Sequence, residues 1–192
     1  LRRACTRLLA ARDEGLEAFC REQADWLEDY ALFMALKGKH GGAPWFEWPE
    51  GERLRRPEAL AAAREELGEE AAFWKGVQYL FFRQWKRLKA CANGSGIAII
   101  GDLPIYVAGD SADVWAAPEE FQLDSGGRPT EVPGCPPDGF SPDGQLWGNP
   151  LFDWEKMRRD GYRWWLRPIA YQFTVYDILR IDHFRGFDEY YA

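Results

Sequence analysis

Apolar residues recur at helical spacing through the first half of the chain. The spacing predicts a helix over residues 16–37 and a short helix, rich in Ala and Glu, over residues 58–67. The longest apolar face predicts a third helix over residues 69–92, with basic side chains gathered towards its C-terminal end and a glycine-rich stop at 93–96. Residues 1–95 are therefore expected to form a helical region.

Two short apolar runs in the second half predict strands. Residues 97–100 are bounded by glycines, and a second run covers residues 175–181. Nearly continuous apolar runs of this length are typical of strands buried in a parallel sheet. Between them, residues 154–173 read as helical, with Asp153 as N-cap and Pro168 expected to kink or divide the helix. The pattern favours an α/β fold.

The segment between these units, residues 103–152, is expected to be a long loop. It holds eight of the chain's twelve prolines. Long loops inside a compact domain usually carry function, and a loop that leaves the C-terminal end of a barrel strand belongs at the active-site face. Residues 96–192 are therefore expected to form a catalytic unit that this loop covers.

Each predicted strand is followed by a carboxylate. Asp102 follows the first run, and Asp182 follows the second, two residues after Arg180. Alternate residues of a strand share a face, so Arg180 should hold Asp182 charged and oriented. Two carboxylates at one rim of a parallel sheet indicate glycoside chemistry or metal binding. The alternative without chemistry is that Asp102 caps a turn and that Arg180 and Asp182 form an ordinary ion pair.

The metal alternative would need a further ligand, for which His183 is the candidate. His183 directly follows Asp182, so it would face the opposite side of a continuing strand. We therefore predict no metal ion and no other cofactor.

Aromatic residues make up 16% of the chain, and many lie in segments rich in Gly and Pro. Aromatic faces on loops can hold the apolar faces of sugar rings, but aromatic residues also make up large cores, as most of these are expected to do. Composition leaves both interpretations open for Trp45, Trp48, Trp115, Phe121, Phe140, Trp147 and Phe152.

Charge and cysteine content limit the partners and the compartment. A formal net charge of −7 argues against nucleic acid, and no apolar stretch is long enough for a membrane span. The four cysteines have no metal-binding spacing, which favours free thiols in the cytoplasm. The chain starts at Leu1 without an initiator Met, so we expect it to be cut from a longer protein.

Seven segments carry longer motifs. They are WLEDYALF at 26–33, GGAPW at 41–45, GDLPIYV at 101–107, DSADVW at 110–115, PPD at 136–138, GQLWGNP at 144–150 and RIDHFRGF at 180–187. Taken in this order, they resemble the 4-α-glucanotransferases, the amylomaltase or disproportionating-enzyme family, which is glycoside hydrolase family 77. The resemblance runs from about residue 16 to the end of the chain.

The resemblance implies a fragment of a (β/α)8 TIM barrel with a helical insert. It implies an enzyme that transfers α-1,4-glucan segments between maltooligosaccharides by double displacement with retention. Asp182 would be the nucleophile, Arg180 would keep it charged, and Asp102 would bind sugar at the donor subsite. Further substrate contacts would come from Asp138, Phe140, Ser141, Gln145, Trp147 and His183. The long loop would exclude water and so favour a sugar as acceptor.

The chain departs from the family pattern at Gly139, where an aromatic residue is frequent. The family's general acid/base Glu and its second, stabilising Asp are expected beyond Ala192, and its first barrel strands upstream. We therefore expect the 192 residues alone to be inactive, and to be marginally stable or associated.

Two alternatives compete with the transferase. The first is a hydrolase of the α-amylase clan with the same Arg-x-Asp strand end, against which the motifs of the covering loop argue. The second is a glucan-binding module without catalysis, in which the pairing of Arg180 with Asp182 would serve no purpose.

Overall fold

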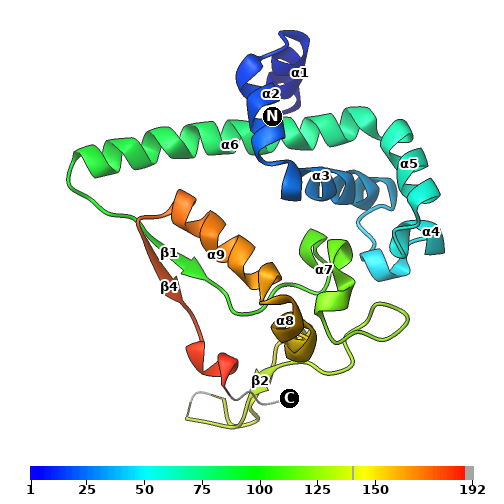
Figure 1. The fold of residues 1–192 in the computed structure, drawn as a ribbon, viewed down its shortest axis with the longest axis vertical. Helices are drawn as coiled ribbons and strands as arrows, with labels where there is room; N and C mark the ends of the chain where they lie inside the picture. Colours follow the sequence, from blue (N-terminus) through cyan, green and yellow to red (C-terminus); the bar gives the residue numbers. More distant parts are fainter. Residues whose placement is uncertain (140, 189–192) are drawn as a thin grey trace. The chain divides into compact units, whose positions relative to one another are not determined.

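The structure, a computed structural model, describes residues 1–139 and 141–188 (Figure 1). The chain divides into two compact units, residues 1–88 and residues 89–192. The division at residue 95, with a helical insert before it and a partial barrel after it, stays a prediction.

The first unit is built from helices (Figure 1). They are α1 (Arg2–Ala10), α2 (Glu14–Glu22), α3 (Ala24–Lys39), the 3-10 turn η1 (Trp45–Glu47), α4 (Glu50–Arg53), α5 (Pro57–Glu66) and the first part of α6 (Gly68–Gly94). The predicted bounds of α5 and α6 are confirmed to within two residues at each end.

The single helix predicted over residues 16–37 is wrong, because the structure has two helices, α2 and α3, that meet at Gln23. Gln23 has φ −106° and ψ 13°, outside the helical range, and its side-chain oxygen accepts a hydrogen bond from the indole nitrogen of Trp26 at 2.9 Å. No Gly or Pro marks this break, so the apolar periodicity runs across it without interruption.

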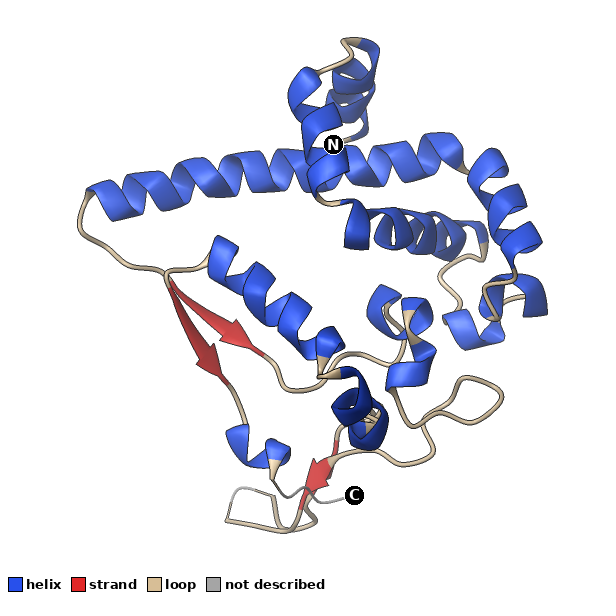
Figure 2. Ribbon diagram, in the orientation of Figure 1, coloured by secondary structure: helices blue, strands red, loops and turns tan. Residues whose placement is uncertain are grey.

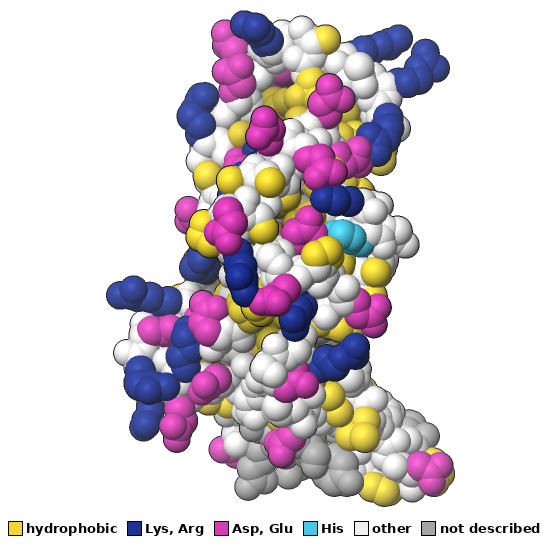
Figure 3. Space-filling model, turned by 90° about the vertical axis from the view of Figure 1, so that its right-hand side faces the viewer, with side chains coloured by type: hydrophobic (Ala, Val, Ile, Leu, Met, Phe, Trp, Pro, Cys, Tyr) yellow, Lys and Arg dark blue, Asp and Glu magenta, His cyan; other side chains and the backbone are white. Residues whose placement is uncertain are grey.

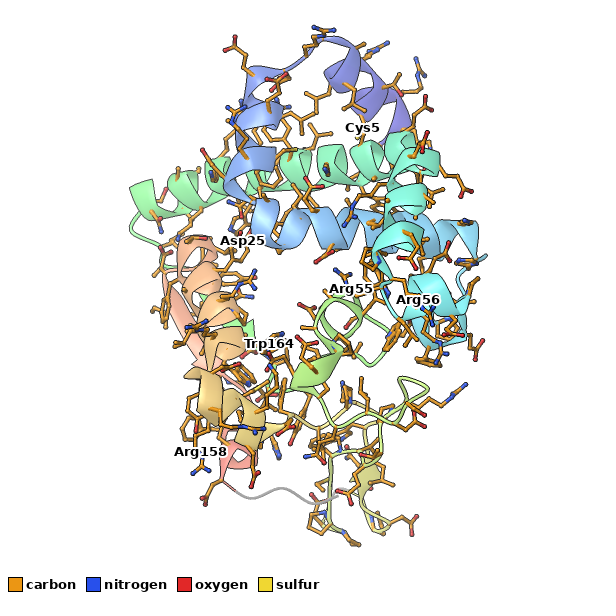
Figure 4. The ribbon with its side chains drawn as sticks, turned by 45° about the vertical axis from the view of Figure 1, so that its right-hand side comes forward. Cys5, Asp25, Arg55, Arg56, Arg158 and Trp164 are labelled. Carbon is orange, nitrogen blue, oxygen red and sulfur yellow. The ribbon has the colours of Figure 1, made fainter. Side chains whose placement is uncertain are left out.

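The core of the first unit centres on α3. Leu27, Leu32 and Leu36 expose at most 2% of their surface. Cys5 of α1, labelled in Figure 4, is 1% exposed and faces α6 at Gly76, where an added Cβ would lie 3.3 Å from the Cys5 sulfur. Residue 76 therefore has to be small for α1 to pack here.

The second unit joins a parallel strand pair to short helices and a small hairpin (Figure 2). Its elements are β1 (Ile100–Leu103), α7 (Ala112–Ala116), η2 (Pro118–Glu120), β2 (Gly134–Cys135), β3 (Gln145–Leu146), α8 (Trp154–Asp160), α9 (Arg163–Val175), β4 (Ile178–Ile181) and η3 (Phe184–Phe187). Strands β1 and β4 pair in parallel, as predicted, and α9 contacts both.

The prediction that both strands are buried is wrong. Ile100 of β1 is 63% exposed and Ile178 of β4 is 50% exposed, and β1 begins at residue 100 rather than at 97. Within the described residues the parallel sheet has two strands, so part of its apolar surface has no neighbouring element to cover it. Close packing does occur at Gly101, where an added Cβ would lie 2.0 Å from the ring of Tyr176.

The helical stretch after residue 153 divides at Gly161 and Tyr162, not at the predicted Pro168. Both residues at the break have positive φ, 76° and 58°, which ends α8 before α9 begins. Pro168 lies inside α9. The predicted N-cap is confirmed, because the Asp153 carboxylate accepts a hydrogen bond from the backbone N–H of Lys156 at 2.9 Å.

An aromatic cluster fills the core of the second unit. Phe152 is fully buried at its centre, with ring centroids between 5.1 and 6.3 Å from five other rings. The neighbours are Tyr106, Phe121, Trp154, Trp164 (labelled in Figure 4) and Trp165. We call these six residues the Phe152 cluster.

Asp177 links the N-terminal ends of the two parallel strands. Its carboxylate accepts hydrogen bonds from the backbone N–H of Ile99 at 2.9 Å and from the Asn93 amide at 2.8 Å, and it pairs with Lys89 at 3.2 Å. These bonds, led by that of Ile99, hold the pKa of the Asp177 carboxyl below its usual value.

Replacing Asp177 by Asn should remove a stabilising term that depends on pH. Because the folded pKa lies below the unfolded value of about 3.9, the term is complete above that value and is lost as the pH falls through the folded pKa. The difference in unfolding free energy between wild type and Asp177→Asn should therefore be constant from pH 5 to 7 and shrink below pH 4 (roughly the unfolded pKa). Urea titrations across this range measure it, with exposed Asp143→Asn as the charge-matched control. A difference that did not change with pH would contradict the assignment.

Candidate active site at the ends of the parallel strands

One arginine joins two carboxylates at the ends of β1 and β4. The register places Asp102 opposite Arg180. The guanidinium of Arg180 donates one hydrogen bond to Asp102 at 2.7 Å and another to Asp182 at 2.6 Å. The pairing of Arg180 with Asp182 follows from strand alternation, whereas the bridge to Asp102 is an addition that the structure provides.

These three side chains form an accessible, charged group. Each is more than half exposed, so water screens their attraction and the bridge serves chiefly to orient them. The backbone N–H of Asp182 donates to the carbonyl of Leu103 at 3.2 Å, which fixes Asp182 where β4 ends. A charged, oriented carboxylate open to solvent can act as a nucleophile towards an electrophilic carbon.

The long segment 103–152 contains short elements, although the sequence predicted none. Strands β2 and β3 pair as an antiparallel hairpin, and the residues between them form its tip. At this tip the Asp138 carboxylate accepts from the backbone N–H of Ser141 at 2.8 Å, and the Ser141 hydroxyl donates to the carbonyl of Gly144 at 2.7 Å. Asp138 and Ser141 therefore shape the turn itself. Phe140 lies outside the described residues.

Trp147 brings this hairpin to the strand ends. Its indole lies edge-on to the ring of His183, with centroids 5.1 Å apart and an interplanar angle of 89°. Its Nε1–H donates to the side-chain oxygen of Gln145 at 2.9 Å. The structure thus joins Gln145, Trp147 and His183, and His183 follows Asp182 directly. Because β4 ends at Ile181, the expectation that His183 faces away does not apply.

Five of the seven loop aromatics are core residues, so the sugar-contact interpretation is wrong for them. Their exposed fractions run from 0 to 5%, too little to present a ring face to a ligand. They are Trp45, Trp48, Trp115, Phe121 and Phe152. Trp147, at 37% exposed, keeps an accessible ring.

Two residues that shape this site were not predicted from the sequence. Tyr106, just after β1, has its ring centroid 6.1 Å from that of Trp147 and stacks on Phe152. The Asn149 side chain donates to the carbonyl of Val107 at 2.7 Å and closes the base of the loop. Tyr106 and Asn149 lie within the motifs at 101–107 and 144–150. The motifs mark both residues, but their spacing does not predict which residues they contact.

Three further findings concern surface charge, metal-binding clusters and membrane-spanning helices. Figure 3 shows acidic and basic side chains interspersed on the face that it draws. Among residues 1–139 and 141–188, no three His, Cys, Asp or Glu side chains gather closely enough to hold a metal ion. No helix in the described part of the chain is long and apolar enough to cross a membrane.

Comparisons with known proteins agree with one another. The family model described as 4-alpha-glucanotransferase matches residues 1–192. The 4-alpha-glucanotransferase of Thermus thermophilus is 55% identical over 178 residues, which is 93% of this chain and 36% of that protein. That of Streptococcus pneumoniae is 47% identical over 193 residues, covering 100% of this chain and 38% of that protein.

Among solved structures, an amylomaltase from Streptococcus agalactiae in complex with acarbose aligns with a TM-score of 0.87 at 45% identity. The alignment covers 91% of this chain and 35% of that one. The chain thus spans little more than a third of the length of the relatives it matches.

Proposed function

Because the chain belongs to the 4-alpha-glucanotransferase family, glycoside hydrolase family 77, we propose that its protein transfers α-1,4-glucan segments between maltooligosaccharides. The observation that carries the proposal is the bridge from Arg180 to Asp102 and Asp182 at the ends of two parallel strands. It provides a nucleophile and, beside it, a second carboxylate that can accept hydrogen bonds from sugar hydroxyls.

The reaction proceeds in two displacements with retention. First, a carboxylate oxygen of Asp182 attacks C1 of the donor sugar, and the bond from C1 to the glycosidic oxygen breaks. The leaving oxygen takes a proton from a general acid, a role assigned to none of the described residues. Then the 4-hydroxyl oxygen of an acceptor sugar attacks C1, returns its proton to that group and frees the Asp182 carboxylate. One α-1,4 bond breaks and one forms.

The other candidate residues serve binding. Asp102 accepts hydrogen bonds from donor hydroxyls, while Gln145 and Trp147 offer an amide and a ring face to the acceptor. Asp138, Phe140 and Ser141 belong to the same covering loop, and His183 lies beneath it. By excluding water, the loop favours sugar over water as the second nucleophile.

The same proposal extends to architecture and location. The β1–β4 pair with α9 against it is one parallel unit of a (β/α)8 TIM barrel, and residues 1–95 include a helical insert. Four free cysteines fit a cytoplasmic location, and the proposed reaction requires no cofactor.

Incubation of the full-length protein containing these residues with maltotriose tests the proposal. Transfer should give a ladder of shorter and longer maltooligosaccharides with an unchanged number of reducing ends. Formation of glucose and maltose with a rise in reducing ends would instead support the hydrolase. Binding of maltotriose without any conversion would support the glucan-binding module. The 192-residue chain should yield no ladder when it is tested alone.

A further inference from the structure

We propose that His183 is a positioning residue that couples the covering loop to the nucleophile. Its ring is the surface on which Trp147 docks, so the loop is held over the strand ends only when the turn after Asp182 is in place. The inference rests on the proposed function for its kinetic consequence, whereas the docking itself is a structural claim. It gives His183 a role apart from direct contact with substrate.

The backbone at His183 is held in an uncommon conformation. Its φ is 48°, in the left-handed region that few residues other than Gly adopt, although His, like Asn and Asp, occurs there more often than most. On one side, the N–H of Asp182 donates to Leu103 at 3.2 Å; on the other, the N–H of Gly186 donates to the carbonyl of His183 at 2.9 Å. The turn is therefore anchored at both ends, and the same turn fixes Asp182 and aims the imidazole.

The imidazole of His183 packs against the backbone of Gly186. An added Cβ there would lie 3.1 Å from a ring carbon of His183, 3.1 Å from the Tyr106 hydroxyl and 2.8 Å from Ile105. A side chain at 186 would press on Ile105, Tyr106 and the imidazole, so the motif's glycine lets the turn close against the ring without moving them. The ring is thus placed between the backbone at 186 and the indole of Trp147.

The loop side of the contact is also anchored. The backbone N–H of Trp147 donates to the carbonyl of Pro133 at 3.0 Å, which ties the indole to the hairpin of β2 and β3. Tyr106 lies beside Trp147 and stacks on Phe152 of the buried cluster. Displacement of the His183 ring would therefore move Trp147 and, with it, the hairpin that carries Gln145.

The coupling has a specific consequence for the second displacement. When the His183 ring is lost, the hairpin loses its support next to Asp182, and water reaches the glycosyl-enzyme more often. The share of hydrolysis should rise and the KM for the acceptor should increase, while formation of the glycosyl-enzyme changes less. A residue that merely stabilised the fold would lower all steps together.

Two substitutions separate the ring from the backbone. His183→Asn keeps a residue that tolerates positive φ but removes the ring, and His183→Phe keeps a ring that can meet Trp147 edge-on. In maltotriose reactions, His183→Asn should raise the number of reducing ends formed per transfer event about fivefold, because hydrolysis creates a reducing end and transfer does not. His183→Phe, whatever it loses in overall rate, should give a count nearer to wild type than to His183→Asn, because it keeps a ring against Trp147.

Hydrogen exchange of the peptide covering residues 133–147 provides the readout that does not depend on activity. Exchange should be faster in His183→Asn and near wild type in His183→Phe. Trp147→Leu removes the contact from the other side, and adding His183→Asn to it should change exchange no further. A thermal melt of each variant establishes that it is folded before its exchange enters this cycle.

The outcomes are separable. If wild type transfers no glucan, the proposed function fails, and the exchange data alone decide whether His183 docks the loop. If wild type is active but His183→Asn changes neither exchange nor the reducing-end count, the inference is wrong. It is equally wrong if adding His183→Asn to Trp147→Leu speeds exchange further.

Discussion

Replacing Asp182 by Asn in the full-length protein should lower the rate of maltooligosaccharide transfer by at least ~10³-fold while the protein stays folded. The amide is neutral and a poor nucleophile, so no glycosyl-enzyme forms at a useful rate. Its oxygen can still accept the hydrogen bond from Arg180, which preserves the local geometry. The measurement is product formation from maltotriose over several hours, alongside a thermal melt of each protein.

A matched control exchanges another carboxylate for its amide. Glu65 lies on the exposed side of α5, and Glu65→Gln removes one charge without touching the strand ends. It should keep wild-type turnover. Full turnover by Asp182→Asn would show that the nucleophile lies elsewhere and that the pair formed by Arg180 and Asp182 is an ordinary ion pair.

Replacing Phe152 by Ala should destabilise the second unit by about 3–5 kcal/mol. The side chain is fully buried among five aromatic rings, so truncation leaves a cavity that rigid neighbours cannot fill. The loss also removes the ring on which Tyr106 stacks, so the hairpin carrying Trp147 should exchange hydrogen faster. Urea titration measures the shift in unfolding midpoint.

Two further variants provide comparisons for the destabilisation caused by Phe152→Ala. Phe152→Leu keeps most of the volume and should cost less than half as much as Phe152→Ala. Phe184→Ala removes a ring that is 68% exposed and should change stability by less than ~1 kcal/mol. Equal effects of Phe184→Ala and Phe152→Ala would contradict the view that the Phe152 cluster organises this unit.

Local rules predicted the parts of the fold that local contacts determine. Pro57 starts α5 and Asp153 caps α8, because each acts within one turn of its own position. The divisions at Gln23 and Gly161 escaped prediction. Gln23 is not a residue type that signals a break. Gly161 is one, since glycine ends many helices in the left-handed conformation, but the prediction placed the division at Pro168 instead.

The site shows the same limit. Strand alternation predicted Arg180 beside Asp182, and the pair forms although β4 ends at Ile181, one residue before Asp182. That Asp102 shares the same guanidinium depends on the register of two distant strands, and the contact of Trp147 with His183 depends on how a hairpin folds back. Burial of an aromatic residue such as Trp115 likewise depends on what covers it, so composition could not separate core from binding surface.

The sequence separation of Asp102 and Arg180 also determines how long β1 waits for its partner strand during synthesis. The two residues are 78 positions apart, yet their strands lie side by side in parallel register. At a ribosomal speed of roughly 5–20 residues per second, β1 leaves the ribosome about 4–16 s before its partner. Throughout that interval β1 presents an apolar, unpaired edge to chaperones and to other nascent chains. The pace of translation between the two strands therefore determines how long each new molecule can mispair before the bridge from Arg180 to Asp102 can form.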